Sequence, residues 1–128
     1  MRRLLATVAL ATALGSGCGD DDQEARTTTV EGPSELRVVG NEYSFDPETV
    51  IYESGGSRAE ITISLDNRGA LAHNLKVFAG GRELGGTPTF PGGREESGTV
   101  ELDPGEYRMV CTVGNHEELG MTGTLEVR

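Results

Sequence analysis

Near its C-terminus the chain reads Cys111-Thr-Val-Gly-Asn-His116-Glu-Glu-Leu-Gly-Met121, in which a thiol, an imidazole and a thioether recur at intervals of five residues. The other histidine of the chain, His73, lies in Leu71-Ala-His73-Asn-Leu-Lys-Val-Phe78, which has the alternation of a strand. These two stretches therefore bring together four side chains that can bind a metal ion through nitrogen or sulfur.

Two histidines, one cysteine and one methionine form the ligand set of a mononuclear blue-copper site. Soft sulfur ligands favour copper over hard cations, and a weak axial thioether is one means of tuning the reduction potential. Each residue alone has a structural explanation, because single buried cysteines and methionines usually belong to the core. The combination predicts one copper ion bound by His73, Cys111, His116 and Met121. Met109, which lies outside this pattern, is predicted to be packing.

Residues 1–17 are predicted to be a signal peptide. Arg2 and Arg3 are followed by an apolar stretch over 4–14 that is too short to span a bilayer, and Gly15-Ser16-Gly17 leads into Cys18. Small residues before a cysteine at this place resemble a bacterial lipoprotein signal, whose cysteine is cleaved and acylated. An ordinary secretory signal is the alternative. Either predicts export, to the periplasm or the outer face of the cell membrane.

The lipoprotein prediction bears on the second cysteine. If Cys18 carries lipid, Cys111 has no partner for a disulfide. An unpaired thiol in an exported protein is open to oxidation unless something occupies it. Copper ligation would occupy it.

The chain is acidic, with a formal net charge of −10 at pH 7. Loss of the two basic residues Arg2 and Arg3 with a signal peptide changes this charge to −12. Nucleic-acid binding needs a basic face, so a nucleic-acid partner is not expected. Beyond residue 17 no apolar run approaches the length of a membrane span. Lipid on Cys18 is thus the predicted membrane anchor.

Residues 18–34 are acidic, rich in threonine and almost free of large apolar groups, so they are predicted to be a flexible tether. Residues 35–128 are predicted to form one domain of short strands separated by Gly, Pro, Asn and Asp, since no stretch has a clear 3.6-residue apolar period. The predicted strands are Leu36–Asn41, Thr49–Glu53, Ala59–Asn67, Ala72–Ala79, Ser97–Leu102, Glu106–Val113 and Thr122–Arg128. Together with nineteen glycines, they predict an all-β fold, an antiparallel sandwich or barrel.

Strand alternation supports a shielded site independently of the ligand types. Three of the four candidate ligands share a strand face with apolar residues: His73 with Leu75 and Val77, Cys111 with Met109, and Met121 with Leu125 and Val127. These three ligands are therefore predicted to point inward.

From Phe45 onward the chain resembles the plastocyanin-like branch of the cupredoxins, which are type 1 blue copper proteins, and particularly its membrane-anchored bacterial and archaeal members. The similar stretches are Phe45-Asp-Pro47-Glu-Thr-Val50-Ile-Tyr52-Glu-Ser-Gly55, Asn67…His73-Asn74, Pro104-Gly105-Glu-Tyr107-Arg-Met-Val-Cys111 and His116-Glu-Glu-Leu-Gly120-Met121-Thr-Gly123. The resemblance implies an antiparallel Greek-key fold of about seven to eight strands. It also implies that His73, Cys111 and His116 are equatorial ligands and Met121 the axial one. Asn74 would support the thiolate and tie the ligand loops together.

These features predict a monomeric one-electron carrier that exchanges electrons with redox protein partners. A copper carrier or buffer without electron transfer stays open as an alternative, although exported chaperones usually hold copper in exposed Met- or His-rich sites. An enzyme is not expected. A thiol hydrolase would need an activated Cys111, for which the sequence shows no helix N-terminus, and a multicopper oxidase needs more histidines than two.

Glu117 and Glu118 directly follow the candidate ligand His116. In the proteins that the chain resembles, an apolar patch surrounds the exposed edge of this histidine, and electrons pass through it. Here such a patch could be formed, with an acidic rim, by Ala70, Leu71, Ala72 and Leu119. The negative charges of the two glutamates would be complementary to a basic surface, so we predict a redox partner with a basic docking face. The alternative is that they are ordinary solvated charges.

Overall fold

The computed structural model describes residues 26–128, which form ten β-strands and no helix. The prediction of an all-β fold is confirmed. No helix in this part of the chain is long and apolar enough to cross a membrane. The predicted signal peptide, Cys18 and the first part of the predicted tether lie outside the described residues.

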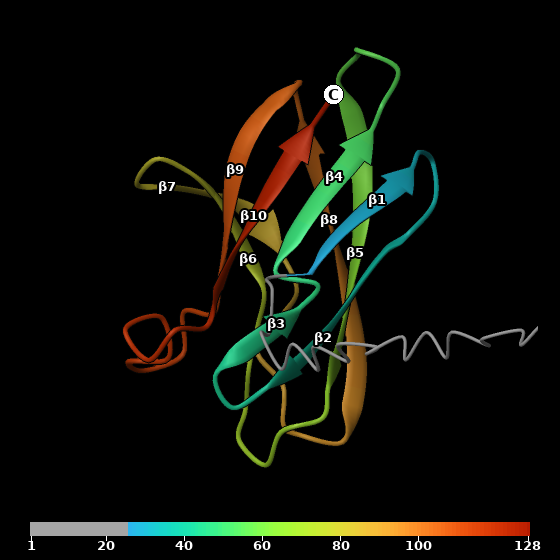
Figure 1. Cartoon of the computed structure of the whole chain (residues 1–128). Helices are drawn as coiled ribbons and strands as arrows, with labels where there is room; N and C mark the ends of the chain where they lie inside the picture. Colours follow the sequence, from blue (N-terminus) through green and yellow to red (C-terminus); the bar gives the residue numbers. More distant parts are fainter. Residues whose placement is uncertain (1–25) are drawn as a thin grey trace, which may run out of the picture.

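The strands form two sheets that pack face to face as a sandwich (Figure 1). In spatial order, the six-stranded sheet contains β1 (Thr27–Glu31), β4 (Thr49–Glu53), β10 (Thr122–Val127), β9 (Gly105–Val110), β6 (Lys76–Ala79) and β7 (Arg82–Gly86). The four-stranded sheet contains β3 (Ser44–Asp46), β2 (Leu36–Asn41), β5 (Ala59–Asn67) and β8 (Arg94–Leu102).

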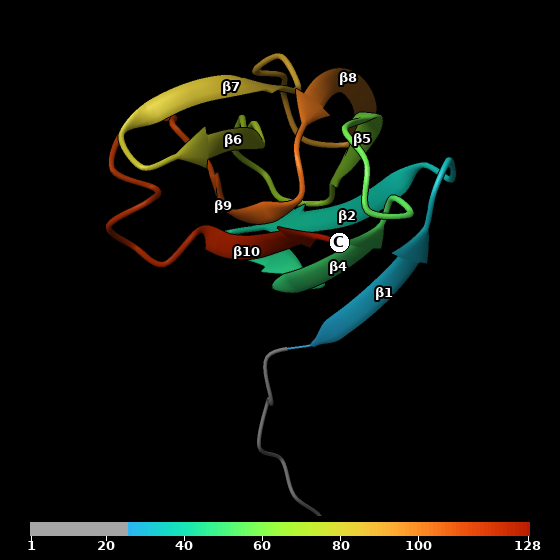
Figure 2. The ribbon, with the colours of Figure 1, turned by 90° about the horizontal axis from the view of Figure 1, so that it is seen from above.

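The larger sheet curves until its edge strand β7 lies beside β8 of the other sheet (Figure 2). The approach is so close that a side chain at Gly98 of β8 would collide with the backbone carbonyl of Gly86 in β7, which explains the glycine at position 98. The two strands do not join into one ladder, so the fold is a sandwich and not a closed barrel.

The predicted β-sandwich is confirmed, but the expected antiparallel arrangement of about seven to eight strands is corrected in two respects. There are ten strands, and three of the strand pairs are parallel: β1 with β4, β10 with β4, and β2 with β5. Both sheets are therefore mixed. Apolar alternation shows which face of a strand is buried, but a strand carries the same pattern beside a parallel or an antiparallel neighbour.

The tether predicted over 18–34 does not extend that far, because Thr27–Glu31 form β1 and pair with β4. The side chains of β1 are mostly exposed, so this edge strand shows little apolar pattern. Backbone hydrogen bonds to β4 hold it instead. The folded domain thus begins before residue 35, where the sequence predicted its start.

Inward-facing residues of the two sheets form the core. In β5, for example, Ile61, Ile63 and Leu65 are buried whereas Glu60 and Thr62 are exposed, as the alternation predicts. The same buried cluster includes Cys111 and Met121. Two of the predicted ligands therefore lie within the packed interior.

Candidate metal centre

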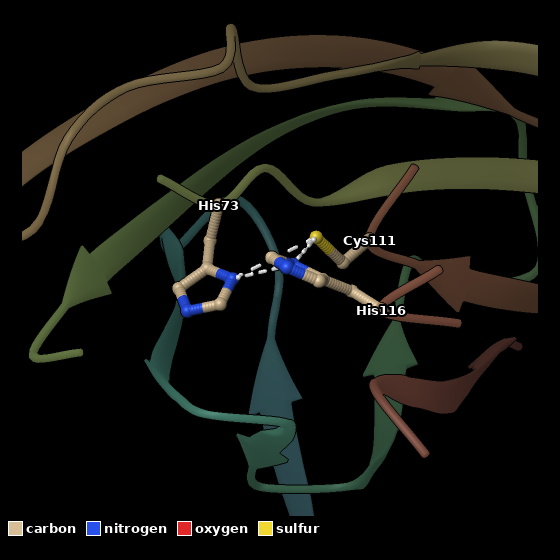
Figure 3. Close-up of side chains that lie close together, drawn as sticks. All are labelled: His73, Cys111 and His116. Atoms are coloured by element: carbon tan, nitrogen blue, oxygen red, sulfur yellow. Dashed lines mark hydrogen bonds between the residues drawn. The ribbon is translucent and has the colours of Figure 1, made fainter. Parts of the chain in front are cut away.

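The side chains of His73, Cys111 and His116 converge on one buried point (Figure 3). The Nδ1 atoms of the two histidines lie 3.1 Å apart. The Cys111 sulfur lies 3.5 Å from Nδ1 of His116 and 3.8 Å from Nδ1 of His73. His73 and Cys111 are fully buried, and His116 is 7% exposed.

The three donor atoms are spaced as the ligands of one ion would be. In zinc sites, imidazole nitrogen and thiolate sulfur lie about 2.0–2.3 Å from the metal. Pairs of donors separated by 3.1 to 3.8 Å can therefore contact a single ion between them. Cys111 is a free thiol among the described residues. Two imidazoles and a thiolate fit one type 1 copper ion.

The backbone around His73 is held by hydrogen bonds rather than by a long strand. The predicted strand over 72–79 is regular only from Lys76, and His73 forms an isolated bridge with Phe90 through two 3.1 Å backbone hydrogen bonds. The buried Asn67 amide donates to the carbonyls of Leu71 and Phe90. These contacts fix the segment that carries the first histidine.

The other three candidate ligands lie on the loop between β9 and β10, and backbone hydrogen bonds link different parts of this loop. The backbone N–H of Cys111 donates to the carbonyl of Met121 at 3.1 Å, and the N–H of Met121 donates to the carbonyl of His116 at 3.0 Å. A turn bond joins the His116 N–H to the carbonyl of Val113 at 3.0 Å. These bonds hold Cys111, His116 and Met121 close together within one loop.

Met121 is fully buried and its backbone lies beside Cys111. Its role as the axial ligand stays a prediction. Met109 is also fully buried, and it pairs with Gly123 across β9 and β10, where a side chain on that glycine would meet its methyl group. This position is that of a core residue.

Asn74 joins the two ligand segments. Its amide nitrogen lies 2.8 Å from the hydroxyl of Thr89 and 2.8 Å from that of Thr112, and its carbonyl oxygen accepts the Thr112 N–H at 2.9 Å. Because Thr112 follows Cys111 directly, Asn74 ties the segment that carries His73 to the backbone next to Cys111.

The far side of the His73 ring faces a carboxylate that sequence reasoning missed. Nε2 of His73 lies 3.3 Å from Oε1 of Glu42, in the turn between β2 and β3. Burial lowers the pKa of His73, and Glu42 opposes that shift; the neutral imidazole is the form that binds metals. Hydrogen bonds, above all from the Leu71 N–H, lower the pKa of Glu42. Nothing in the local sequence relates Glu42 to a histidine 31 residues later.

The predicted acidic rim is partly neutralised. Glu117 forms a 2.7 Å ion pair with Arg108, whereas Glu118 is exposed and has no ion pair with any described residue. Leu71 and Leu119 from the predicted apolar patch are 44% and 49% exposed. They are the exposed large apolar side chains of the described domain.

The comparison with solved structures identifies the fold. The sequence matches no protein-family model and no curated protein. The structure is similar to an auracyanin from Roseiflexus castenholzii (TM-score 0.65, 20% identity, covering 73% of this chain and 96% of that chain). It is also similar to an azurin from Methylomonas sp. strain J (0.65, 16%, 75% and 98%) and to auracyanin A, a "blue" copper protein from Chloroflexus aurantiacus (0.55, 19%, 80% and 100%).

The protein therefore has the fold of the blue copper proteins, the cupredoxins. The predicted resemblance is confirmed for the fold. The membrane-anchored character that the resemblance implied stays a prediction.

Proposed function

We propose that the protein is a mononuclear blue copper protein that carries single electrons between redox partners in the cell envelope. The convergence of His73, Cys111 and His116 at one buried point supports this proposal most directly. It occurs in a chain with the cupredoxin fold, and proteins with similar structures include a "blue" copper protein.

The role of the chain is to hold the ligands still and to exclude water. Copper, when bound, would supply the one-electron couple between Cu(I) and Cu(II). His73 and Cys111 are fully buried and their backbones are fixed by hydrogen bonds to Phe90 and Met121. A cage of this kind moves little when the charge of the ion changes, which favours fast electron transfer.

His116 is the ligand proposed to pass electrons to a partner, because it is the one that keeps some exposure. Leu71 and Leu119, which are exposed, would contribute to the contact surface. A partner with a basic face would suit the acidic chain, and the protein would act as a monomer.

The alternative of a copper carrier or buffer is less well supported because the cluster is enclosed. A carrier must release its ion, and His116 is the only one of the three clustered ligands with any measurable exposure. A thiol enzyme is disfavoured for a similar reason, since a substrate cannot reach the fully buried sulfur of Cys111.

Titration of the purified protein with Cu(II) tests the function. We expect one copper per chain, an intense visible absorption, and a reversible one-electron couple at an electrode. Binding without a blue colour would contradict the proposed site. A blue protein that loses its copper on reduction would favour the buffer.

Replacement of Met121 by leucine is expected to keep the blue site but to raise its reduction potential. Three strong ligands remain, and loss of a weak donor destabilises Cu(II) more than Cu(I). Voltammetry of the two proteins measures the change. Met109→Leu is the matched control and should leave the potential almost unchanged, since Met109 packs in the core. An unaltered potential in Met121→Leu would make Met121 a packing residue too.

Lipid on Cys18 is proposed as the attachment to the membrane, on the basis of the residues that precede it. The native protein should partition into detergent, and its intact mass should include acyl chains. A water-soluble protein with an unmodified Cys18, or with an N-terminus further along the chain, would leave export without an anchor. The copper site does not depend on this result.

A further inference from the structure

Glu42 reaches from the turn between β2 and β3 to the segment that leads into His73. Its Oε1 atom accepts the backbone N–H of Leu71 at 2.7 Å and lies 3.3 Å from Nε2 of His73. The carboxylate packs so closely on Gly69 that any side chain there would collide with it. One charged group thus contacts both the backbone before the histidine and the histidine itself.

The two ring nitrogens of His73 face different surroundings. Nδ1 points to Cys111 and His116, where the metal would lie, and Nε2 points to Glu42. A neutral histidine that binds a metal through Nδ1 carries its proton on Nε2, and this N–H needs an acceptor when it is buried. Oε1 of Glu42 is the acceptor that lies within reach.

We propose that Glu42 is a positioning residue of the copper centre, whose carboxylate holds Nδ1 of His73 toward the metal and stabilises Cu(II) relative to Cu(I). Carboxylate partners of metal-bound histidines fix the ring and raise the basicity of the ligand. The next residue, Tyr43, packs edge-on against His116 with ring centroids 5.0 Å apart. The β2–β3 turn therefore contacts both histidine ligands. This inference rests on the proposed function.

Two substitutions separate the contact from the charge. Glu42→Gln keeps the shape, and its amide oxygen can accept from both Leu71 and His73, but it removes the negative charge. Glu42→Ala removes contact and charge together. Glu60→Gln is the control, because Glu60 is exposed on β5, at the opposite end of that strand from Asn67 and the site.

Affinity for Zn²⁺, measured by competition with a chromophoric chelator, reports positioning without any redox step, since two imidazoles and a thiolate also bind zinc. Loss of a carboxylate that accepts a hydrogen bond from a metal-binding histidine typically weakens metal binding 10- to 100-fold. We expect a loss in this range for Glu42→Ala, a smaller loss for Glu42→Gln, and none for Glu60→Gln.

The reduction potential of the copper site measures the effect of the negative charge of Glu42. Each tenfold loss of Cu(II) affinity at constant Cu(I) affinity raises the potential by about 59 mV for a one-electron couple, so Glu42→Gln should raise it and Glu60→Gln should not. The proposal is overturned if both Glu42 variants match Glu60→Gln in zinc affinity and in potential. A wild-type copper complex without blue colour would instead refute the proposed function, and the zinc affinities would still decide whether Glu42 positions His73.

Discussion

The Cys111→Ser protein is expected to lose essentially all of the intense visible absorption that the copper-loaded wild type should show. That absorption would arise from charge transfer between a thiolate and Cu(II), and Cys111 is the only cysteine after residue 18. A serine hydroxyl is a harder and weaker ligand for copper. The measurement is the visible spectrum of each protein during titration with Cu(II), at matched copper content.

Cys18→Ser is the matched control and should leave the band unchanged, because Cys18 is not one of the four predicted copper ligands. His73→Ala and His116→Ala should retain the thiolate but weaken copper binding or admit external ligands. Metal analysis must come first, since zinc can fill the same site during expression and leave a preparation colourless. A band that survives Cys111→Ser would show that the sulfur of Cys111 is not a ligand.

The second large effect is expected on the rate of electron transfer to a partner with a basic face. Charge steering can raise association to 10⁸–10⁹ M⁻¹s⁻¹ at low salt, against roughly 10⁵–10⁶ without it. For the wild type, the rate should fall steeply toward 0.15 M salt, where the Debye length is about 8 Å. Substitution of both glutamates, Glu117→Gln with Glu118→Gln, should flatten this dependence and leave the visible spectrum nearly intact.

The ion pair between Glu117 and Arg108 adds detail to this expectation. Because Arg108 already offsets the charge of Glu117, Glu118→Gln alone should produce much of the flattening. In the double variant Arg108 also loses its ion-pair partner, so its charge is no longer offset by Glu117. Stopped-flow kinetics over a salt series measure these slopes, with Glu60→Gln as the control for net charge. Equal salt slopes in all the proteins would leave these glutamates without a docking role.

Strands that bury one face could be predicted from the sequence, whereas strands that are exposed on both faces could not. In β5, alternation of Ile61, Ile63 and Leu65 predicts both the strand and its inward face. In β1 most side chains are exposed, so the acidic and threonine-rich composition favoured a tether. The threonines at 27–29 are β-branched and favour a strand, and this was the one signal that could have revealed β1.

In the site, the residues recognised by type and spacing could be predicted, whereas a contact formed only in the folded structure could not. His73, Cys111 and His116 could be proposed from their types and spacing, and the structure brings all three together. Strand parity predicted the inward direction of His73, Cys111 and Met121, but it gave none for His116, which lies in a loop. Glu42 could not be proposed, because its contact with His73 depends on how the β2–β3 turn meets the segment before that histidine.

By itself, the sequence determined the candidate donor side chains, the inward direction of three of them and the all-β character of the domain, because ligand chemistry and the two-residue period of a strand are local properties. Only the tertiary structure decided which strands are neighbours, including the parallel pairing of β2 with β5. It also decided which polar side chains meet, as Glu42 does with His73 and Arg108 with Glu117. A strand with one buried face can pair with any other strand that has the same alternation. The sequence around an exposed charged residue does not show which residue it will contact. Strand neighbours and side-chain contacts are fixed only when the whole core packs together.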